Sequence, residues 1–207
     1  MIIKVCGMRA SENIREVEAL GIDWMGFIFY TRSSRYVGAN PPAYLPCHCK
    51  RVGVFVNSPA SEILHKVDAF GLDIVQLHGD ESPAFCCQLR ESLADNVQLI
   101  KMVSISCETD LTATTGYAPY IDYFLFESPC GSYGGSGKKF DWSLLEQYHG
   151  NPPFILTGGI GSDDAEEIHS LTHPRFAGID LNSRFEVSAG TKNPELLRTF
   201  IDKIRTT

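Results

Sequence analysis

Two side chains that can move protons each stand directly after a short apolar run of the sequence. Cys6 follows the run 2–5, and Glu127 follows the run 123–126. A thiolate and a carboxyl group facing each other across a site can take a proton from one atom of a small substrate and give one to a neighbouring atom. Each residue also has a plainer interpretation: Cys6 as a buried structural cysteine and Glu127 as a solvated carboxylate. Whether the two act as a pair depends on whether the fold brings them to one site.

Two turns of small residues indicate where an anion would bind. Gly158-Gly159 stands between an apolar run and a helix start predicted at Ser162, and Asn182-Ser183 follows another apolar run. Glycine lets backbone N–H groups approach a ligand closely, and a helix N-terminus favours negative charge. A tight turn that binds nothing is the alternative. We predict a phosphate site formed by these two turns.

Further polar residues could orient a substrate. Arg35 could bind a substrate carboxylate through two parallel hydrogen bonds, or could be an ordinary surface arginine. Gln76 and His78 are two positions apart, so both side chains would point to the same face of a strand. Asp180 lies within the last apolar run. We expect these four residues to contact the substrate.

The sequence predicts neither a metal site nor a nucleotide site. Cys47-His48-Cys49 and Cys86-Cys87 lack the C-x₂-C pairing of a zinc site. The Gly-rich fingerprints of dinucleotide-binding and P-loop proteins are missing, because the only Gly-Lys pair has neither a glycine five residues upstream nor a Ser or Thr after it. We therefore expect no metal and no cofactor.

Composition argues against several kinds of partner. The 207 residues carry a formal charge of −7 and no basic block, which argues against binding to nucleic acid or to an anionic membrane. No segment reaches the roughly 18 apolar residues of a membrane helix, and we expect no signal peptide. Seven scattered cysteines are typical of a reducing compartment, so we expect a cytoplasmic protein.

The order of elements predicts how these residues come together. Eight short apolar runs, typical of buried strands, span 2–5, 24–29, 52–56, 74–77, 99–103, 123–126, 154–157 and 177–181. Amphipathic segments between them begin near Ser11, Ser58, Ser82, Ser162 and Asn193. Eight strand–helix units of about 26 residues predict a closed (β/α)8 barrel, the TIM-barrel fold, as one domain over 1–207. The Thr-rich segment 106–117 is the weakest helix, and an open doubly wound sheet is the alternative.

A barrel of this class carries its chemistry at the carboxyl ends of its strands and in the loops that follow them. Every candidate residue named above falls at such a position or beside one. Phosphate sites of these barrels often lie after the seventh and eighth strands, where the two small-residue turns stand. We therefore expect one small-molecule site at one end of the barrel.

Seven short motifs run along the whole chain in a characteristic order. They are residues 4–9 (KVCGMR), 29–37 (FYTRSSRYV), 53–57 (GVFVN), 76–81 (QLHGDE), 134–137 (GGSG) with 140–142 (FDW), 157–160 (TGGI) and 178–183 (GIDLNS). Together they resemble the phosphoribosylanthranilate isomerase family of tryptophan biosynthesis. The resemblance implies a cofactor-free Amadori rearrangement of N-(5-phosphoribosyl)anthranilate to the 1-deoxyribulose 5-phosphate derivative. It also implies that Cys6 takes the proton from C2, that the carboxyl group of residue 127 protonates the ring oxygen, and that Arg35 holds the anthranilate carboxylate.

Two places depart from the usual pattern of that family. The family usually has Asp-Thr at the end of the sixth strand, where this chain has Glu127-Ser128. Glutamate adds one methylene, about 1.5 Å of reach, and a misplacement near 1 Å can cost on the order of 10²-fold in rate. In the last turn, Asn182 replaces a common serine and Arg184 replaces a small residue. Arg184 either reaches the phosphate or crowds its site.

Two other functions remain as alternatives. One is another phosphosugar barrel, such as a ribulose-phosphate epimerase or an indole-glycerol-phosphate synthase. The first would need metal-ligating His and Asp at strand ends, and the second a Lys/Glu set and a longer N-terminus; neither is seen. The other alternative is a barrel that binds the phosphorylated ligand but has lost catalysis through the change at Glu127. In each case we expect a small phosphorylated ligand, and a monomer or a homodimer.

Overall fold

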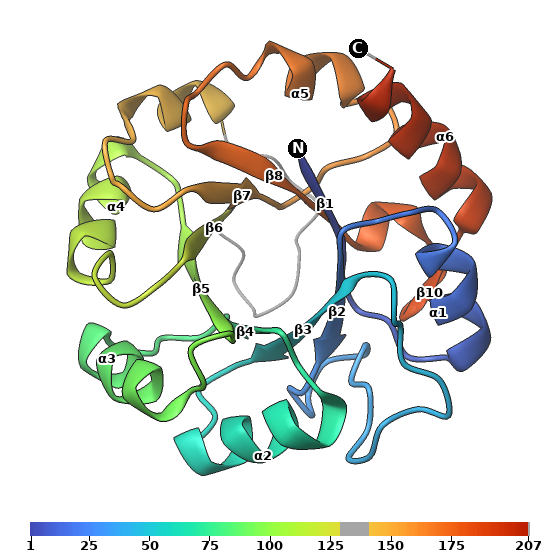
Figure 1. The fold of residues 1–207 in the computed structure, drawn as a ribbon. Helices are drawn as coiled ribbons and strands as arrows, with labels where there is room; N and C mark the ends of the chain where they lie inside the picture. Colours follow the sequence, from blue (N-terminus) through green and yellow to red (C-terminus); the bar gives the residue numbers. More distant parts are fainter. Residues whose placement is uncertain (129–140, 207) are drawn as a thin grey trace.

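Eight parallel strands form the centre of the molecule. The computed structural model describes residues 1–128 and 141–206. The strands close into a barrel in chain order, because β1 pairs with both β2 and β8 (Figure 1). They are β1 (Ile2–Val5), β2 (Trp24–Ile28), β3 (Lys50–Phe55), β4 (Ile74–Leu77), β5 (Gln98–Ser104), β6 (Tyr123–Glu127), β7 (Phe154–Leu156) and β8 (Phe176–Leu181). The predicted (β/α)8 barrel is confirmed, and the open doubly wound sheet is excluded.

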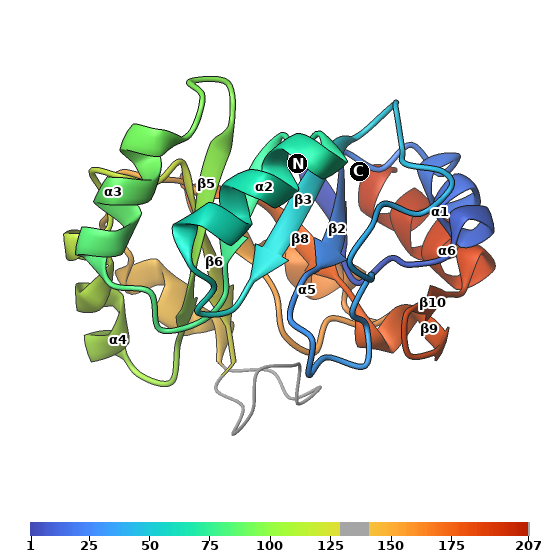
Figure 2. The same cartoon turned by 90° about the horizontal axis from the view of Figure 1, so that it is seen from below.

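Helices surround the barrel, and several begin at the residues that the sequence predicts (Figures 1 and 2). Ser82 caps one helix by accepting a hydrogen bond from the N–H of Phe85, and Asn193 caps another by accepting from Glu195 and Leu196. Proline follows both caps at a position where its missing N–H loses no intrahelical partner. The helices are α1 (Ser11–Glu18), α2 (Ala60–Phe70), α3 (Pro83–Ser92), α4 (Glu108–Thr112), α5 (Ala165–Ser170) and α6 (Pro194–Arg205), with short 3₁₀ helices η1 (Ala113–Gly116), η2 (Trp142–Gln147) and η3 (Ser183–Phe185).

The prediction that every strand is followed by a helix is wrong between β2 and β3. The segment that connects them contains no helix. Pro41, Pro42 and Pro46 stand in it, and proline removes N–H donors and fixes φ, which prevents a helix from extending. Instead, the start of the segment runs beside β2, where the N–H of Val37 donates to the carbonyl of Ile28 at 3.0 Å.

Two other helix predictions have different outcomes. The weak helix predicted over 106–117 is confirmed, as α4 followed by η1. The helix start predicted at Ser162 is wrong, because α5 begins at Ala165. The N–H of Gly161 donates to Asp164 Oδ2 at 2.7 Å, which closes a turn before the helix starts. The loop after β7 is therefore longer than the sequence suggests.

Alternate residues of the strands point into the barrel and form two layers there. The layer nearer the amino ends of the strands is apolar and consists of Trp24, Val52, Ile74, Ile100, Leu125 and Ile155. Successive side chains of a strand point to opposite faces, so the residues two positions later lie on the same inner face. On β4 and β6 these residues are Gln76 and Glu127. One end of the barrel interior is thus filled by apolar side chains, and the other end carries polar ones.

A short hairpin follows the barrel. Its strands are β9 (Glu186–Ser188) and β10 (Thr191–Lys192), and the sequence analysis did not predict it. The hairpin lies beside α1 and α6 on the side toward which the arrowheads of β2 and β3 point (Figure 2). It therefore borders the polar end of the barrel. No helix within the described ranges has both the length and the apolar character needed to cross a membrane.

Candidate active site

One pocket opens at the carboxyl ends of the strands, and every predicted site residue lines it. The predicted residues in its lining are Cys6, Arg35, Gln76, His78, Glu127, Gly158, Gly159, Asp180, Asn182 and Ser183. They come from both ends of the chain, so the pairing of β1 with β8 is what brings them together. Arg184 lines the same pocket.

Cys6 lies beside a buried ion pair. The cysteine is only 3% exposed. Lys4, two residues earlier on the same face of the strand, donates from Nζ to Asp180 Oδ2 at 2.8 Å. Burial raises the pKa of the Cys6 thiol, and the charge of Lys4 partly opposes this rise. The thiol is therefore protonated in the free protein at neutral pH. Lys4 is not among the residues predicted from the sequence, although a lysine within the apolar run 2–5 is a signal that could have indicated its role.

The raised pKa of Cys6 predicts a pH dependence. If the thiolate is the base, the active fraction grows as the pH rises toward that pKa. We expect kcat/KM to increase with pH through the neutral and mildly alkaline range, approaching about tenfold per unit well below the pKa. Steady-state kinetics measures kcat/KM at each pH. The difference in ultraviolet absorbance between native protein and a Cys6→Ser variant measures the fraction of Cys6 that is thiolate. A flat kcat/KM over a range in which the thiolate forms would contradict the role.

Glu127 belongs to a chain of three polar side chains. His78 Nε2 lies 3.2 Å from Glu127 Oε2, and His78 Nδ1 lies 3.0 Å from Gln76 Nε2. With the amide nitrogen of Gln76 as the donor, Nδ1 accepts and the ring N–H that faces Glu127 is on Nε2. That proton points at the carboxyl group of Glu127. The histidine therefore fixes the position of this carboxyl group at the pocket wall.

Buried oxygens without partners mark where a ligand can donate hydrogen bonds. Within the described ranges, Gln76 Oε1, Asp180 Oδ1 and Ser128 Oγ are buried and have no hydrogen-bond partner. The first two belong to residues that line the pocket. Because a buried polar atom without a partner is costly, such atoms usually receive one from a bound molecule or water. A polyhydroxylated ligand would supply these donors.

The two predicted phosphate turns lie together in the pocket. Gly158 and Gly159 have φ angles of +90° and +73°, a region that favours glycine. A Cβ on Gly158 would lie only 3.0 Å from the backbone nitrogen of Ser128, so the chain passes very close there. Because α5 starts only at Ala165, the backbone N–H groups of the turns, rather than the end of that helix, are the donors available to an anion.

Two glycine-to-valine variants test the phosphate turn. Gly159→Val should raise KM by about tenfold or more, because a side chain there blocks backbone approach to the ligand. Gly21→Val is the matched control: its φ is +71°, so the backbone strain of about 1–2 kcal/mol is the same, but it lies between α1 and β2 at the opposite end of the barrel. We expect a similar fall in Tm for both variants and a normal KM for the control. An unchanged KM in Gly159→Val would contradict the phosphate assignment.

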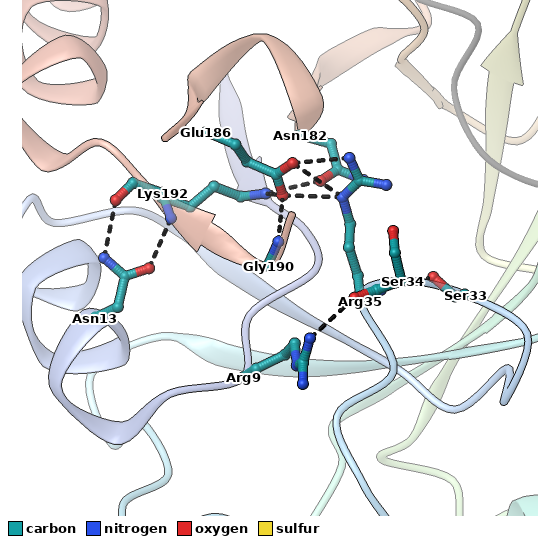
Figure 3. A network of polar contacts seen from close by, with 9 residues as sticks. All are labelled: Arg9, Asn13, Ser33, Ser34, Arg35, Asn182, Glu186, Gly190 and Lys192. Atoms are coloured by element: carbon teal, nitrogen blue, oxygen red, sulfur yellow. Dashed lines mark hydrogen bonds and ion pairs between the residues drawn. The ribbon is translucent and has the colours of Figure 1, made fainter. Parts of the chain in front are cut away.

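Two residues that the sequence analysis did not single out border the site. Glu186 in β9 binds the guanidinium of Arg35, and Lys192 in β10 reaches both Glu186 and Asn182 (Figure 3). Arg35 is therefore not a free surface arginine. The pairing joins residues 151 positions apart, so no local pattern could have indicated it.

Two other sequence features do not contribute to the site as described. The motif at 134–137 falls outside the described residues. Glu18 accepts hydrogen bonds from the N–H groups of Cys47 and His48, each at 2.6 Å, which ties that segment to α1. Across residues 1–128 and 141–206, no three His, Cys, Asp or Glu side chains are grouped so as to hold a metal.

Comparisons with known proteins point to one family. A family model for N-(5'-phosphoribosyl)anthranilate (PRA) isomerase matches residues 3–203. The chain is 48% identical over 209 residues to the N-(5'-phosphoribosyl)anthranilate isomerase of Parabacteroides distasonis, covering 99% of this chain and 93% of that protein. A phosphoribosyl anthranilate isomerase structure from Thermotoga maritima has a TM-score of 0.83 at 29% identity, covering 100% of both chains. Another, in complex with reduced 1-(o-carboxyphenylamino)-1-deoxyribulose 5-phosphate, has a TM-score of 0.80 at 26% identity and the same coverage.

Proposed function

We propose, since this chain belongs to the N-(5'-phosphoribosyl)anthranilate isomerase family, that it converts N-(5'-phosphoribosyl)anthranilate to 1-(2-carboxyphenylamino)-1-deoxyribulose 5-phosphate in tryptophan biosynthesis. The family resemblance of the seven motifs is confirmed by the match over residues 3–203, and this match is the observation that carries the function. The reaction is an internal aldose–ketose isomerisation, so proton transfers within one pocket suffice for it.

The proton transfers are assigned to Glu127 and Cys6. Glu127 gives a proton to the ring oxygen as the C1–O bond breaks, and the lone pair of the anthranilate nitrogen forms an iminium with C1. Cys6, as the thiolate, takes the proton from C2, and the electrons of that C–H bond form the C1=C2 bond of an enamine. A proton then reaches C1 while the 2-hydroxyl loses its own, which produces the ketone. Glu127 ends β6 and Cys6 directly follows β1, and both residues line the same pocket.

The binding groups are assigned by charge and by position. Arg35 binds the anthranilate carboxylate, because a guanidinium matches a carboxylate with two parallel hydrogen bonds. The backbone N–H groups of the turns at 158–159 and 182–183 bind the phosphate. The sugar hydroxyls donate to the unpartnered oxygens of Gln76 and Asp180, while His78 holds Glu127 in place. We further propose a cytoplasmic protein that acts as a monomer or a homodimer, which light scattering would distinguish.

A second candidate function is a barrel that binds this ligand without turning it over. The observation behind it is the longer side chain of Glu127 in a place where the family usually has aspartate. Binding is retained in this case and only the acid step fails. Among the described residues that line the pocket, none favours another phosphosugar enzyme over the family reaction.

A coupled assay tests both candidates. The purified protein is mixed with phosphoribosylanthranilate generated in situ, and its disappearance is followed with a Cys6→Ser sample as the control for spontaneous breakdown. Protein-dependent turnover supports the isomerase. Affinity for the product without turnover supports the binding barrel, and the absence of both would contradict either function.

A further inference from the structure

The guanidinium of Arg35 is held in one orientation by Glu186 (Figure 3). Arg35 Nε donates to Glu186 Oε1 at 2.9 Å and Nη2 donates to Oε2 at 2.7 Å, so the contact is bidentate. The side chain of Glu186 is only 5% exposed. The stem of Arg35 passes over Gly7, where a Cβ would lie 2.8 Å from Arg35 Cδ. Contacts along the stem and at the tip therefore restrict the rotamers of this arginine.

This arrangement leaves one edge of the guanidinium for a ligand. A guanidinium has five N–H donors, and Glu186 occupies the edge formed by Nε and Nη2. The edge formed by Nη1 and the second N–H of Nη2 has the same spacing and fits a second carboxylate. Figure 3 shows the remaining nitrogen of Arg35 directed away from Glu186. Arg35 lines the pocket, so a ligand there can reach it.

Glu186 also binds a second cation. Lys192 Nζ lies 2.6 Å from Glu186 Oε1 and 2.7 Å from Asn182 Oδ1. The backbone of Lys192 is held to Asn13 of α1 by two hydrogen bonds of 2.8 and 3.0 Å. Arg35 and Lys192 thus share one carboxylate, and the three side chains carry one net positive charge. A ligand carboxylate at Arg35 would balance that charge.

We propose that Glu186 is a positioning residue that makes Arg35 selective for a ligand carboxylate. The proposal rests on the proposed function, because the anthranilate part of the substrate supplies this carboxylate. Glu186 does not touch the ligand; it acts by presenting the open edge of the guanidinium. Lys192 keeps Glu186 in place and ties the hairpin to the turn that contains Asn182. Without Glu186 the arginine samples several rotamers, and ordering it on binding weakens affinity.

The test compares two ligands that differ only in the carboxylate. They are the product, 1-(2-carboxyphenylamino)-1-deoxyribulose 5-phosphate, and its analogue with an unsubstituted phenylamino group. Titration calorimetry on native protein and on Glu186→Gln should show product affinity falling by about tenfold, while affinity for the analogue changes by less than about twofold. In steady-state assays, KM should rise by a similar factor and kcat should stay nearly constant.

A double-mutant cycle tests whether Glu186 acts through Arg35. In an Arg35→Met background, Glu186→Gln should cause no further loss of product affinity, because the group that it positions is gone. Glu186→Asp serves if Glu186→Gln folds poorly. It keeps the negative charge beside Lys192 but shortens the reach to Arg35, so the same selective loss is expected.

The outcomes separate this inference from the proposed function. An equal loss for both ligands would overturn the inference and leave Glu186 a structural role. The inference would also be overturned if native protein binds the product normally and Glu186→Gln binds it equally well or more tightly. That result would leave the proposed function intact. Native protein that binds neither ligand would overturn the proposed function, and the inference with it.

Discussion

Replacing Cys6 with serine should lower kcat by about 10²- to 10⁴-fold, the range that a positioned general base contributes. A serine hydroxyl has almost the same size and keeps the pocket shape, but it is a far weaker acid than a thiol and does not supply an anion beside Lys4. Product affinity should change much less than kcat. Single-turnover kinetics and titration with the product measure the two effects separately.

Cys86→Ser is the matched control for this prediction. Cys86 is also buried, in α3, and burial raises the pKa of its thiol to about 11. It does not line the pocket. We expect its variant to lose some stability and to keep its kcat. Near-native turnover by Cys6→Ser would require another residue to be the base.

Replacing Glu127 with glutamine should lower kcat by about 10²- to 10⁴-fold as well, because an amide cannot protonate the ring oxygen. The amide oxygen can still accept the hydrogen bond from His78 Nε2, which lies 3.2 Å from the carboxylate, so the pocket should keep its shape. Unchanged product affinity together with a collapsed kcat would support the role. A variant with normal kcat would leave the general acid unassigned.

The aspartate variant decides how the longer acid is accommodated. The contact with His78 shows that the carboxyl group of Glu127 is already held at the pocket wall. Glu127→Asp would withdraw the carboxyl group by about 1.5 Å, which breaks this contact and should lower kcat by roughly 10- to 10²-fold. A faster enzyme with aspartate would instead mean that the chain has not adapted to glutamate. Measuring kcat for both variants under the same conditions distinguishes these outcomes.

The barrel and the inner face of its strands could be predicted from the sequence, because both follow from local patterns. Short apolar runs separated by helix-start residues predict parallel strands with crossover helices. Side chains alternate along a strand, so the inward position of Gln76 also implies that of His78. Parallel strands place their carboxyl ends at one end of the barrel. These rules are sufficient to place Cys6 and Glu127 in the predicted site.

Local patterns were insufficient in two places. The repeat implied a helix between β2 and β3, where the prolines prevent one. It also implied a helix start at Ser162, but the turn that begins at Gly161 places the start of α5 three residues later. In both places a side chain or a missing N–H changes the backbone hydrogen bonding over a few residues. Regular repetition says nothing about such exceptions.

Only the tertiary structure decided the electrostatic state of the site. Lys4 and Asp180 are 176 residues apart and meet because β1 pairs with β8. Burial raises the pKa of the Cys6 thiol; the charge of Asp180 adds to this rise, and the charge of Lys4 opposes it. Arg35, in the segment after β2, and Glu186, in the hairpin, are 151 residues apart and meet at the rim of the pocket. The types of these residues are visible in the sequence, but a charge acts over a few ångströms of space, and that separation is set by the closure of the barrel and not by distance along the chain.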